Sequence, residues 1–117
     1  MQDFTNLRVW RDAHSLALEI YDRSRHFPGD ERFGVTSQLR RAASSVAANL
    51  AEGCGRGSDK DFARFVQIAS GSNSEVIYFL LLARDLGYLE VPAHASLDQA
   101  ARTVRRQLLS LLKRLRS

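Results

Sequence analysis

The sequence has few residues that cross-link a chain or interrupt helices: one cysteine, Cys54, and two prolines among 117 residues. A lone thiol excludes an internal disulfide and fits a reducing compartment. The N-terminus lacks the basic and apolar segments of a signal peptide, and the longest strongly apolar run, VIYFLLLA, is far shorter than the roughly 20 residues that cross a bilayer. We therefore expect a cytoplasmic protein, one domain over residues 1–117, that does not enter a membrane.

Alternation of apolar and polar residues, the mark of half-buried strands, is absent as well. Apolar side chains instead recur at three- and four-residue spacing in four segments, which predicts four helices. Their expected ranges are 7–27, 35–53, 59–86 and 92–116, with the second starting at Val35 or Thr36 and the last at Pro92 or Ser96. Short connections favour antiparallel neighbours, so the predicted fold class is all-α, an antiparallel up-down-up-down four-helix bundle.

Local signals mark the ends of these helices. Pro28 stops the first helix, and Gly53 ends the second. Ser58, with Asp61 three residues later, resembles a capping box and starts the third helix, while Gly87 is expected to adopt the left-handed conformation at its end. The last helix shows an apolar heptad seam. Its members are Leu97, Ala101, Val104, Leu108, Leu111 and Leu115.

The stretch AASSVAANLAEG in the second predicted helix is rich in small side chains. In a hairpin with equal rise along both axes, Ala69, Gly71 and Ser72 of the third helix would lie opposite Ala43, Ser44 and their neighbours. We interpret these residues as a close seam between two backbones. Leucine at Ala43 or Gly71 is then expected to overpack the seam and cost roughly 1–3 kcal/mol.

The same register makes a second prediction. It brings Glu75 within reach of Arg40 or Arg41 on the second helix. Such an ion pair, if buried, would be costly to break because removal of one partner leaves the other charge unpaired.

No constellation in the sequence indicates catalysis. Glu52 and Glu75 lie too far apart along the hairpin for an acid/base pair, and no histidine follows a glutamate at the spacing of bundle metal sites. Cys54 lies between glycines near Arg56, which can lower a thiol pKa, but no histidine is near in sequence to act as its base. We therefore expect a protein that is not an enzyme and has neither metal nor cofactor. The histidines fall in different segments: His14, His26 and His94.

Charge is distributed unevenly along the chain. The 13 acidic side chains all lie within positions 1–98, together with 11 of the 17 basic ones, so the last segment supplies the whole positive excess. Such a segment favours phosphate or an acidic partner, although a solvated helix face is the common alternative. Arg56 and Lys60 near the start of the third helix are lesser candidates for anion binding, opposed by Asp59 and Asp61. The basic residues of the last segment are Arg102, Arg105, Arg106, Lys113, Arg114 and Arg116.

Three stretches together resemble a known family: FTNLRVWRDA, FPGDERFGVTSQLRRAASSVAANLAEG and SDKDFARFVQIASGSNSEVIYFLLLARDLGYL. The chain is similar to the small four-helix-bundle proteins encoded in intervening sequences of bacterial 23S ribosomal RNA genes, which are related to accessory proteins of diversity-generating retroelements. The resemblance weakens after Tyr88, where the heptad and the basic character remain. The residues that form its structural motif include Arg40, Arg41, Asn49, Glu52, Gly53, Gly71, Ser72 and Glu75.

The resemblance implies a protomer that assembles into a ring-like homopentamer and has no established enzymatic activity. In the retroelement-associated relatives the basic ring engages RNA and a reverse transcriptase. We therefore expect a non-enzymatic oligomeric accessory protein that binds RNA or other nucleic acid through a basic, arginine-rich surface. The alternative is a protein-interaction scaffold that docks an acidic partner without binding nucleic acid, and the salt dependence of binding distinguishes the two. The expected phosphate contacts are Arg102, Arg105, Arg106, Lys113, Arg114 and Arg116, with Arg56 and Lys60.

Overall fold

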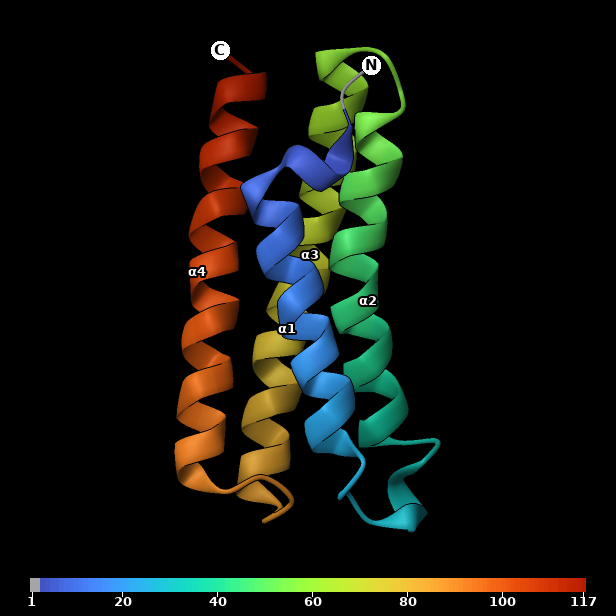
Figure 1. Cartoon of the computed structure of the whole chain (residues 1–117), viewed down its shortest axis with the longest axis vertical. Helices are drawn as coiled ribbons and strands as arrows, with labels where there is room; N and C mark the ends of the chain where they lie inside the picture. The colour runs from blue at the N-terminus through green and yellow to red at the C-terminus, as the bar shows by residue number, and fades with distance from the viewer. Residues whose placement is uncertain (1–2) are drawn as a thin grey trace.

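The computed structural model describes residues 3–117, which fold into four long helices and two short 3-10 turns (Figure 1). No strand occurs among these residues. The elements are η1 (Phe4–Asn6), α1 (Arg8–Ser24), η2 (Gly29–Glu31), α2 (Val35–Cys54), α3 (Asp59–Asp85) and α4 (Val91–Leu115).

The four helices run up and down along the long axis of a molecule that measures 43 × 23 × 20 Å (Figure 1). α1 packs against α2 and α4, and α3 packs against the same two helices, with the most extensive contact between α2 and α3. Each helix thus has two antiparallel neighbours, which is the arrangement that short connections produce. The predicted all-α, up-down-up-down bundle is confirmed.

Capping groups set the bounds of α3 where the sequence places them. The Ser58 hydroxyl accepts a hydrogen bond of 3.2 Å from the backbone amide of Asp61, which satisfies one free donor of the first turn. At the other end Gly87 has φ +80°, and the amide of Tyr88 donates to the carbonyl of Ala83 at 2.9 Å. This is a Schellman motif, in which a left-handed glycine lets the chain turn back and satisfy the last carbonyls.

One continuous core runs through the bundle, and each helix contributes an apolar stripe to it. The heptad seam of α4 is buried from Leu97 to Leu111, and Leu115 packs on the core from its edge. One polar side chain lies deep among these residues. Asn73 of α3 is 1% exposed, and its amide nitrogen donates to the Ala101 carbonyl of α4 at 2.9 Å. The periodicity therefore identified the core face, whereas a polar contact inside it was not expected.

The close seam between α2 and α3 exists, but in a different register from the predicted one. The hydroxyls of Ser45 and Ser72 lie 2.9 Å apart, which shifts α3 by more than one turn relative to α2. Ala43 and Ala69 are buried as expected. The prediction for Gly71 is wrong, because this residue is exposed and an added Cβ would have no neighbour within 4 Å.

Gly53, which the sequence marked only as the end of the second helix, is packed closely against α3. It lies inside α2, and an added Cβ would approach the Phe65 Cβ to 2.8 Å and the Phe62 Cδ1 to 2.9 Å. Two α3 aromatic side chains therefore pack directly on the α2 backbone at this position. Glycine is the residue that permits such close approach.

The predicted ion pair between Glu75 and Arg40 or Arg41 is also wrong. Arg40 turns toward α1, where its Nε donates to the Ser24 hydroxyl at 2.8 Å and its Nη2 to the Tyr21 carbonyl at 3.3 Å. Glu75 is exposed on α3 and lies with Arg41 around a shared hollow of about 240 Å³, but within residues 3–117 neither arginine forms an ion pair with it. Arg40 is therefore turned away toward α1, while Arg41 borders the same hollow as Glu75 without pairing with it.

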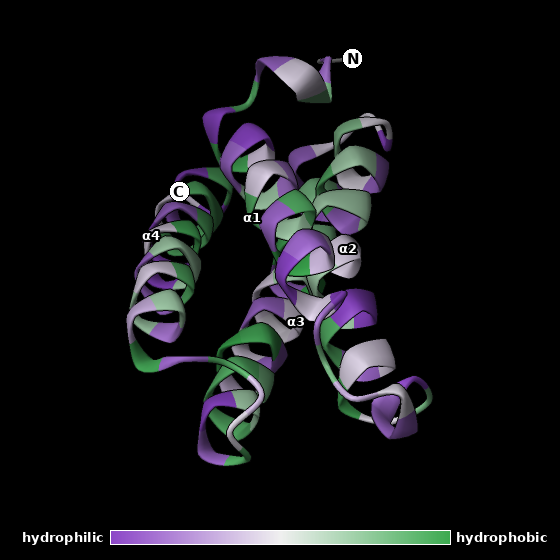
Figure 2. Ribbon diagram, turned by 60° about the horizontal axis from the view of Figure 1, so that its bottom comes forward, coloured by the Kyte–Doolittle hydropathy of each residue, from purple (hydrophilic) through white to green (hydrophobic). Residues whose placement is uncertain are grey.

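α3 is long and apolar enough, by length and composition, to span a membrane, a test that core helices of soluble proteins also pass. Only 28% of its most apolar window is buried in the bundle. Much of the C-terminal half of α3 is coloured hydrophobic in Figure 2. Four residues at heptad spacing form an exposed stripe, called here the α3 outer face: Ile68, Gly71, Glu75 and Tyr78.

Candidate nucleic-acid interface

The end of the bundle opposite η2 brings four helix termini together (Figure 1). α1 and α3 begin there, while α2 and α4 end there. Because of this topology, Arg56 and Lys60 lie at the same end of the molecule as the last turns of α4. The sequence had singled out these residues separately, and the fold places them at one end, which is called here the basic end.

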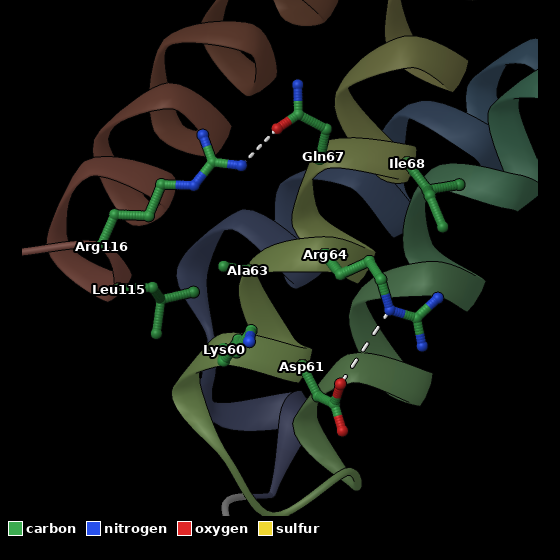
Figure 3. A pocket seen from close by; sticks show the side chains of 8 residues that line it. All are labelled: Lys60, Asp61, Ala63, Arg64, Gln67, Ile68, Leu115 and Arg116. Atoms are coloured by element: carbon green, nitrogen blue, oxygen red, sulfur yellow. Dashed lines mark hydrogen bonds and ion pairs between the residues drawn. The ribbon is translucent and has the colours of Figure 1, made fainter.

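A hollow of about 780 Å³ opens between the start of α3 and the end of α4 (Figure 3). Lys60 and Arg116, both predicted contacts, lie on its two sides, and Arg116 donates from Nη2 to the Gln67 Oε1 at 2.6 Å. Arg64 adds a third cation and has one acidic neighbour, Asp61, at 4.0 Å. The positive charge of this α3/α4 hollow therefore exceeds the negative charge. Its apolar lining consists of Ala63, Ile68 and Leu115.

Phe65 extends this cationic surface toward α2. Its ring lies under the Arg64 guanidinium, 4.6 Å from the ring centroid, and under that of Arg56 at 5.2 Å. Such contacts hold guanidinium groups over an aromatic face. Arg56 also approaches the Glu52 carboxylate to 3.9 Å, an exposed pair that water screens. Arg64 was missed in the sequence, although its spacing of four residues from Lys60 places both on one side of a helix.

A smaller hollow of about 290 Å³ lies between α1 and α4. It is lined by Arg106 and Arg114 of α4 and by Arg8 of α1, which the sequence analysis did not consider. Asp12 faces this region: its carboxylate lies 3.9 Å from Arg8 and accepts from the Gln107 side chain at 2.8 Å. The sequence did contain a signal for Arg8. It lies in the first turn of α1, and the antiparallel arrangement places that turn beside the end of α4.

The remaining predicted cations lie on exposed parts of α4. Arg102 forms an ion pair of 2.9 Å with Asp98, one turn earlier in α4, so its charge is partly neutralised within the helix. Arg105 and Lys113 are exposed and make no ion pair within the described part of the chain. Lys113 and Arg114 also occupy the last turn, where positive charge stabilises the helix dipole. The unpaired charges of α4 thus lie mostly in its C-terminal half.

Comparison with known protein families decides the assignment, because the model of the 23S rRNA-intervening sequence protein family matches residues 5–110. The chain belongs to this family. The match covers α1, α2, α3 and most of α4 of this 23S rRNA-intervening sequence protein. Lys113, Arg114 and Arg116 lie beyond the matched region, so the most basic turns of α4 are not part of what the family model describes.

A solved structure shares the fold. It is the crystal structure of a protein of unknown function from the S23 ribosomal protein family of Bacteroides thetaiotaomicron, with a TM-score of 0.82 and 23% sequence identity. The similarity covers 90% of this 23S rRNA-intervening sequence protein and 95% of the other chain. Comparison with curated proteins found no match.

Two residues of the structural motif, Asn49 and Ser72, form a polar strip with Ser45 between α2 and α3. The Asn49 side chain donates to the Ser45 carbonyl at 2.9 Å and to the Ser45 hydroxyl at 3.0 Å, and that hydroxyl pairs with Ser72. These contacts fix side chains on two facing helices. The small, polar residues of α2 therefore have a packing role, as the sequence analysis proposed for the seam.

The cysteine and the histidines have surroundings that differ from those expected of reactive groups. Cys54 is buried, and burial first, then the negative charge of Asp3, raises the pKa of its thiol, contrary to the lowered pKa that Arg56 suggested. His14 stacks on Trp10 with ring centroids 4.9 Å apart, and His94 is buried. Within residues 3–117 no group of three or more histidine, cysteine or acidic side chains is placed to hold a metal ion.

Proposed function

We propose that this 23S rRNA-intervening sequence protein is a non-enzymatic, ring-forming accessory protein that binds RNA or other nucleic acid through its basic end. The observation that supports this most is the convergence of cations from α1, α3 and α4 on the α3/α4 and α1/α4 hollows. Cations from separate helices define a surface that a phosphate backbone can follow, and such a surface supports binding independent of sequence.

The side chains around the α3/α4 hollow suit this ligand. Arg64 and Arg116 carry planar guanidinium groups, which bind phosphate oxygens in a bidentate manner. The apolar lining next to them offers a surface for a ribose or a base. A ring would repeat each hollow around its axis, and repeated weak contacts raise the overall affinity steeply.

The α3 outer face supports the proposed ring, which we take to be a homopentamer. Ile68 and Tyr78 are 43% and 55% exposed, so this stripe leaves apolar surface in water in an isolated protomer. Gly71 lies between them in the interior of a 27-residue helix, where glycine costs about 1 kcal/mol relative to alanine. Among residues 3–117, no other part of the fold comes within 4 Å of a Cβ added at Gly71, so a closely packed helix of a second protomer accounts for the glycine best.

Light scattering coupled to size exclusion tests this proposal. We expect a species near five times the 13.2 kDa chain, which shifts with a structured RNA at low salt and releases it as salt rises. Alanine at both Arg114 and Arg116 should weaken RNA binding and reduce the salt dependence by about one counterion per lost phosphate contact. The matched control replaces Arg23 and Arg25, two exposed arginines at the opposite end, and should leave binding unchanged.

Two results would contradict the proposal in different ways. A pentamer that ignores RNA at low salt would refute nucleic-acid binding but leave the ring intact. A monomer would remove the ring and its repeated contacts.

A scaffold that docks an acidic protein is the second candidate. The apolar lining of the α3/α4 hollow favours it, since Ala63, Ile68 and Leu115 suit an aliphatic or aromatic side chain flanked by carboxylates. Apolar burial responds weakly to salt, whereas release of counterions from phosphates responds steeply. A partner that remains bound at moderate salt would therefore favour the scaffold.

A further inference from the structure

A second positively charged hollow lies at the other end of the molecule, away from the basic end. It has a volume of about 400 Å³ and opens between the last turns of α1, the segment that follows η2 and the first turns of α2. No carboxylate lines it. This α1/α2 hollow is bordered by three arginines and four hydroxyl-bearing side chains: Arg32, Arg40, Arg41, Tyr21, Thr36, Ser37 and Ser44.

One of these arginines is held firmly in place. Arg40 donates from Nε to the Ser24 hydroxyl at 2.8 Å and from Nη2 to the Tyr21 carbonyl at 3.3 Å, and its guanidinium lies 4.8 Å from the Tyr21 ring centroid. These contacts use two of its five N–H donors, so others remain for a ligand. A guanidinium fixed before binding loses little conformational entropy when a ligand arrives.

The start of α2 has two backbone amides next to the hollow that form no hydrogen bond among the described residues. α2 is 20 residues long, and the hydrogen bonds at its start use the amides of Gly34 and Val35 but not those of Thr36 and Ser37, which line the hollow. Free amides and the helix dipole attract anions at such a terminus. Thr36 gives an independent indication, because its side chain is only 7% exposed and its hydroxyl has no hydrogen-bond partner within the described chain.

Glu31 and Asp22, which adjoin lining residues of the hollow in sequence, bind other groups. Glu31 accepts from the Val35 amide at 3.2 Å with one carboxylate oxygen and from the Tyr88 hydroxyl at 2.7 Å with the other. Asp22 pairs with Arg25 at 3.8 Å. Neither side chain lines the hollow. Glu75 borders a neighbouring hollow with Arg41 but forms no ion pair with it among residues 3–117, so the three arginines leave the α1/α2 hollow positively charged.

We propose that the α1/α2 hollow binds a phosphate group. A phosphate offers several strong acceptor oxygens, which match guanidinium groups, hydroxyls and two free helix amides in one place. The group is either free phosphate or part of a nucleic-acid backbone. This site does not depend on nucleic-acid binding at the basic end, because the two surfaces lie at opposite ends of the bundle.

Amide NMR of the full-length protein tests the site. Inorganic phosphate is titrated at constant ionic strength set by chloride, and the amide signals of Thr36 and Ser37 are followed. We expect saturable shifts of both signals. The phosphate affinity that they report should fall about tenfold when Arg32 and Arg41 are both replaced by alanine, because charge-assisted hydrogen bonds are lost. Arg40 is left intact because it also ties α2 to α1. The control replaces Arg23 and Arg25, which do not line the hollow, and should keep the wild-type affinity.

A second titration with a short single-stranded oligonucleotide identifies the source of the phosphate. Saturable shifts of Thr36 and Ser37 with the oligonucleotide assign the site to a nucleic-acid backbone, and shifts with inorganic phosphate alone assign it to free phosphate. Absence of saturable shifts with both ligands overturns the proposal, as does equal affinity in the Arg32 and Arg41 variant. Oligonucleotide shifts confined to the end of α4, together with no saturable shift of Thr36 and Ser37 by inorganic phosphate, would support the basic end and refute this site.

Discussion

At the scale of single residues, Gly53 is a position where a larger side chain would meet close neighbours. The Phe62 and Phe65 side chains lie so close to its Cα that a methyl group would overlap them. Helix propensity acts in the opposite direction, since alanine is favoured over glycine by about 1 kcal/mol in a helix interior. The sign of the stability change caused by alanine at Gly53 therefore shows whether steric overlap or helix propensity dominates.

We predict that Gly53→Ala lowers the free energy of unfolding by roughly 1–3 kcal/mol, because the aromatic rings or the helices must move apart. Urea denaturation followed by circular dichroism measures the change. Gly29→Ala is the matched control, since an added Cβ there has no neighbour within 4 Å, and it should be close to neutral. An unchanged or increased stability of the Gly53 variant would show that the α2–α3 contact adjusts easily.

At the scale of elements, a buried amide connects α3 to α4. The Asn73 side chain reaches the backbone carbonyl of Ala101 in the middle of α4, among apolar neighbours. Its own oxygen has no partner within the described residues. The contact therefore sets the axial position of the two helices more than it adds to stability, since a hydrogen bond gives only about 1 kcal/mol net.

We predict that Asn73→Ala lowers the free energy of unfolding by about 1–3 kcal/mol, through the lost hydrogen bond and the space left behind. Ser74→Ala is the control, because Ser74 is exposed and its hydroxyl bonds within its own helix, to the carbonyl of Ser70. Equilibrium denaturation compares the two. Equal effects of both changes would argue that Asn73 does not link the helices.

At the scale of the whole molecule, the distribution of exposed side chains separates two surfaces. The basic end gathers cations from several helices, while the α3 outer face presents apolar groups along the side of the bundle. The two surfaces meet at Ile68, which lines the α3/α4 hollow as well as the α3 outer face. An assembly through α3 would repeat the cations of the basic ends around an axis. Closed symmetric rings arise from such contacts between different faces of identical chains.

We predict that Gly71→Arg reduces the mass of the assembly measured by light scattering, while the helix content of each protomer is retained. The arginine has space within its own chain but would meet a partner helix packed on this face. Ser15→Arg, an equal change at an exposed position of α1, should leave the mass unchanged. An assembly of full mass in the Gly71 variant would place the interface elsewhere.

The sequence by itself determined the number of helices, most of their ends and the apolar stripe that each one buries. These features depend on neighbours within one or two turns: the Ser58 cap, the left-handed Gly87 and the heptad of α4 are local signals. The charge distribution pointed to Arg116 and Lys60, and the family resemblance added the expectation of a nucleic-acid surface. None of these signals contains information about how one helix is offset or rotated against the next.

Only the tertiary structure decided the register of α2 against α3, the hydrogen-bond partners of Arg40 and which cations of α1 and α3 lie beside those of α4. An offset of more than one turn moves Ser72 to Ser45 and leaves Gly71 exposed, yet the apolar pattern along either helix is the same. The tertiary structure also adds Arg64 and Arg8 to the basic end. Both lie beside residues of the C-terminal helix and its end, which are distant from them in sequence. Contacts between distant segments follow from side-chain packing across the whole core, which local periodicity does not specify.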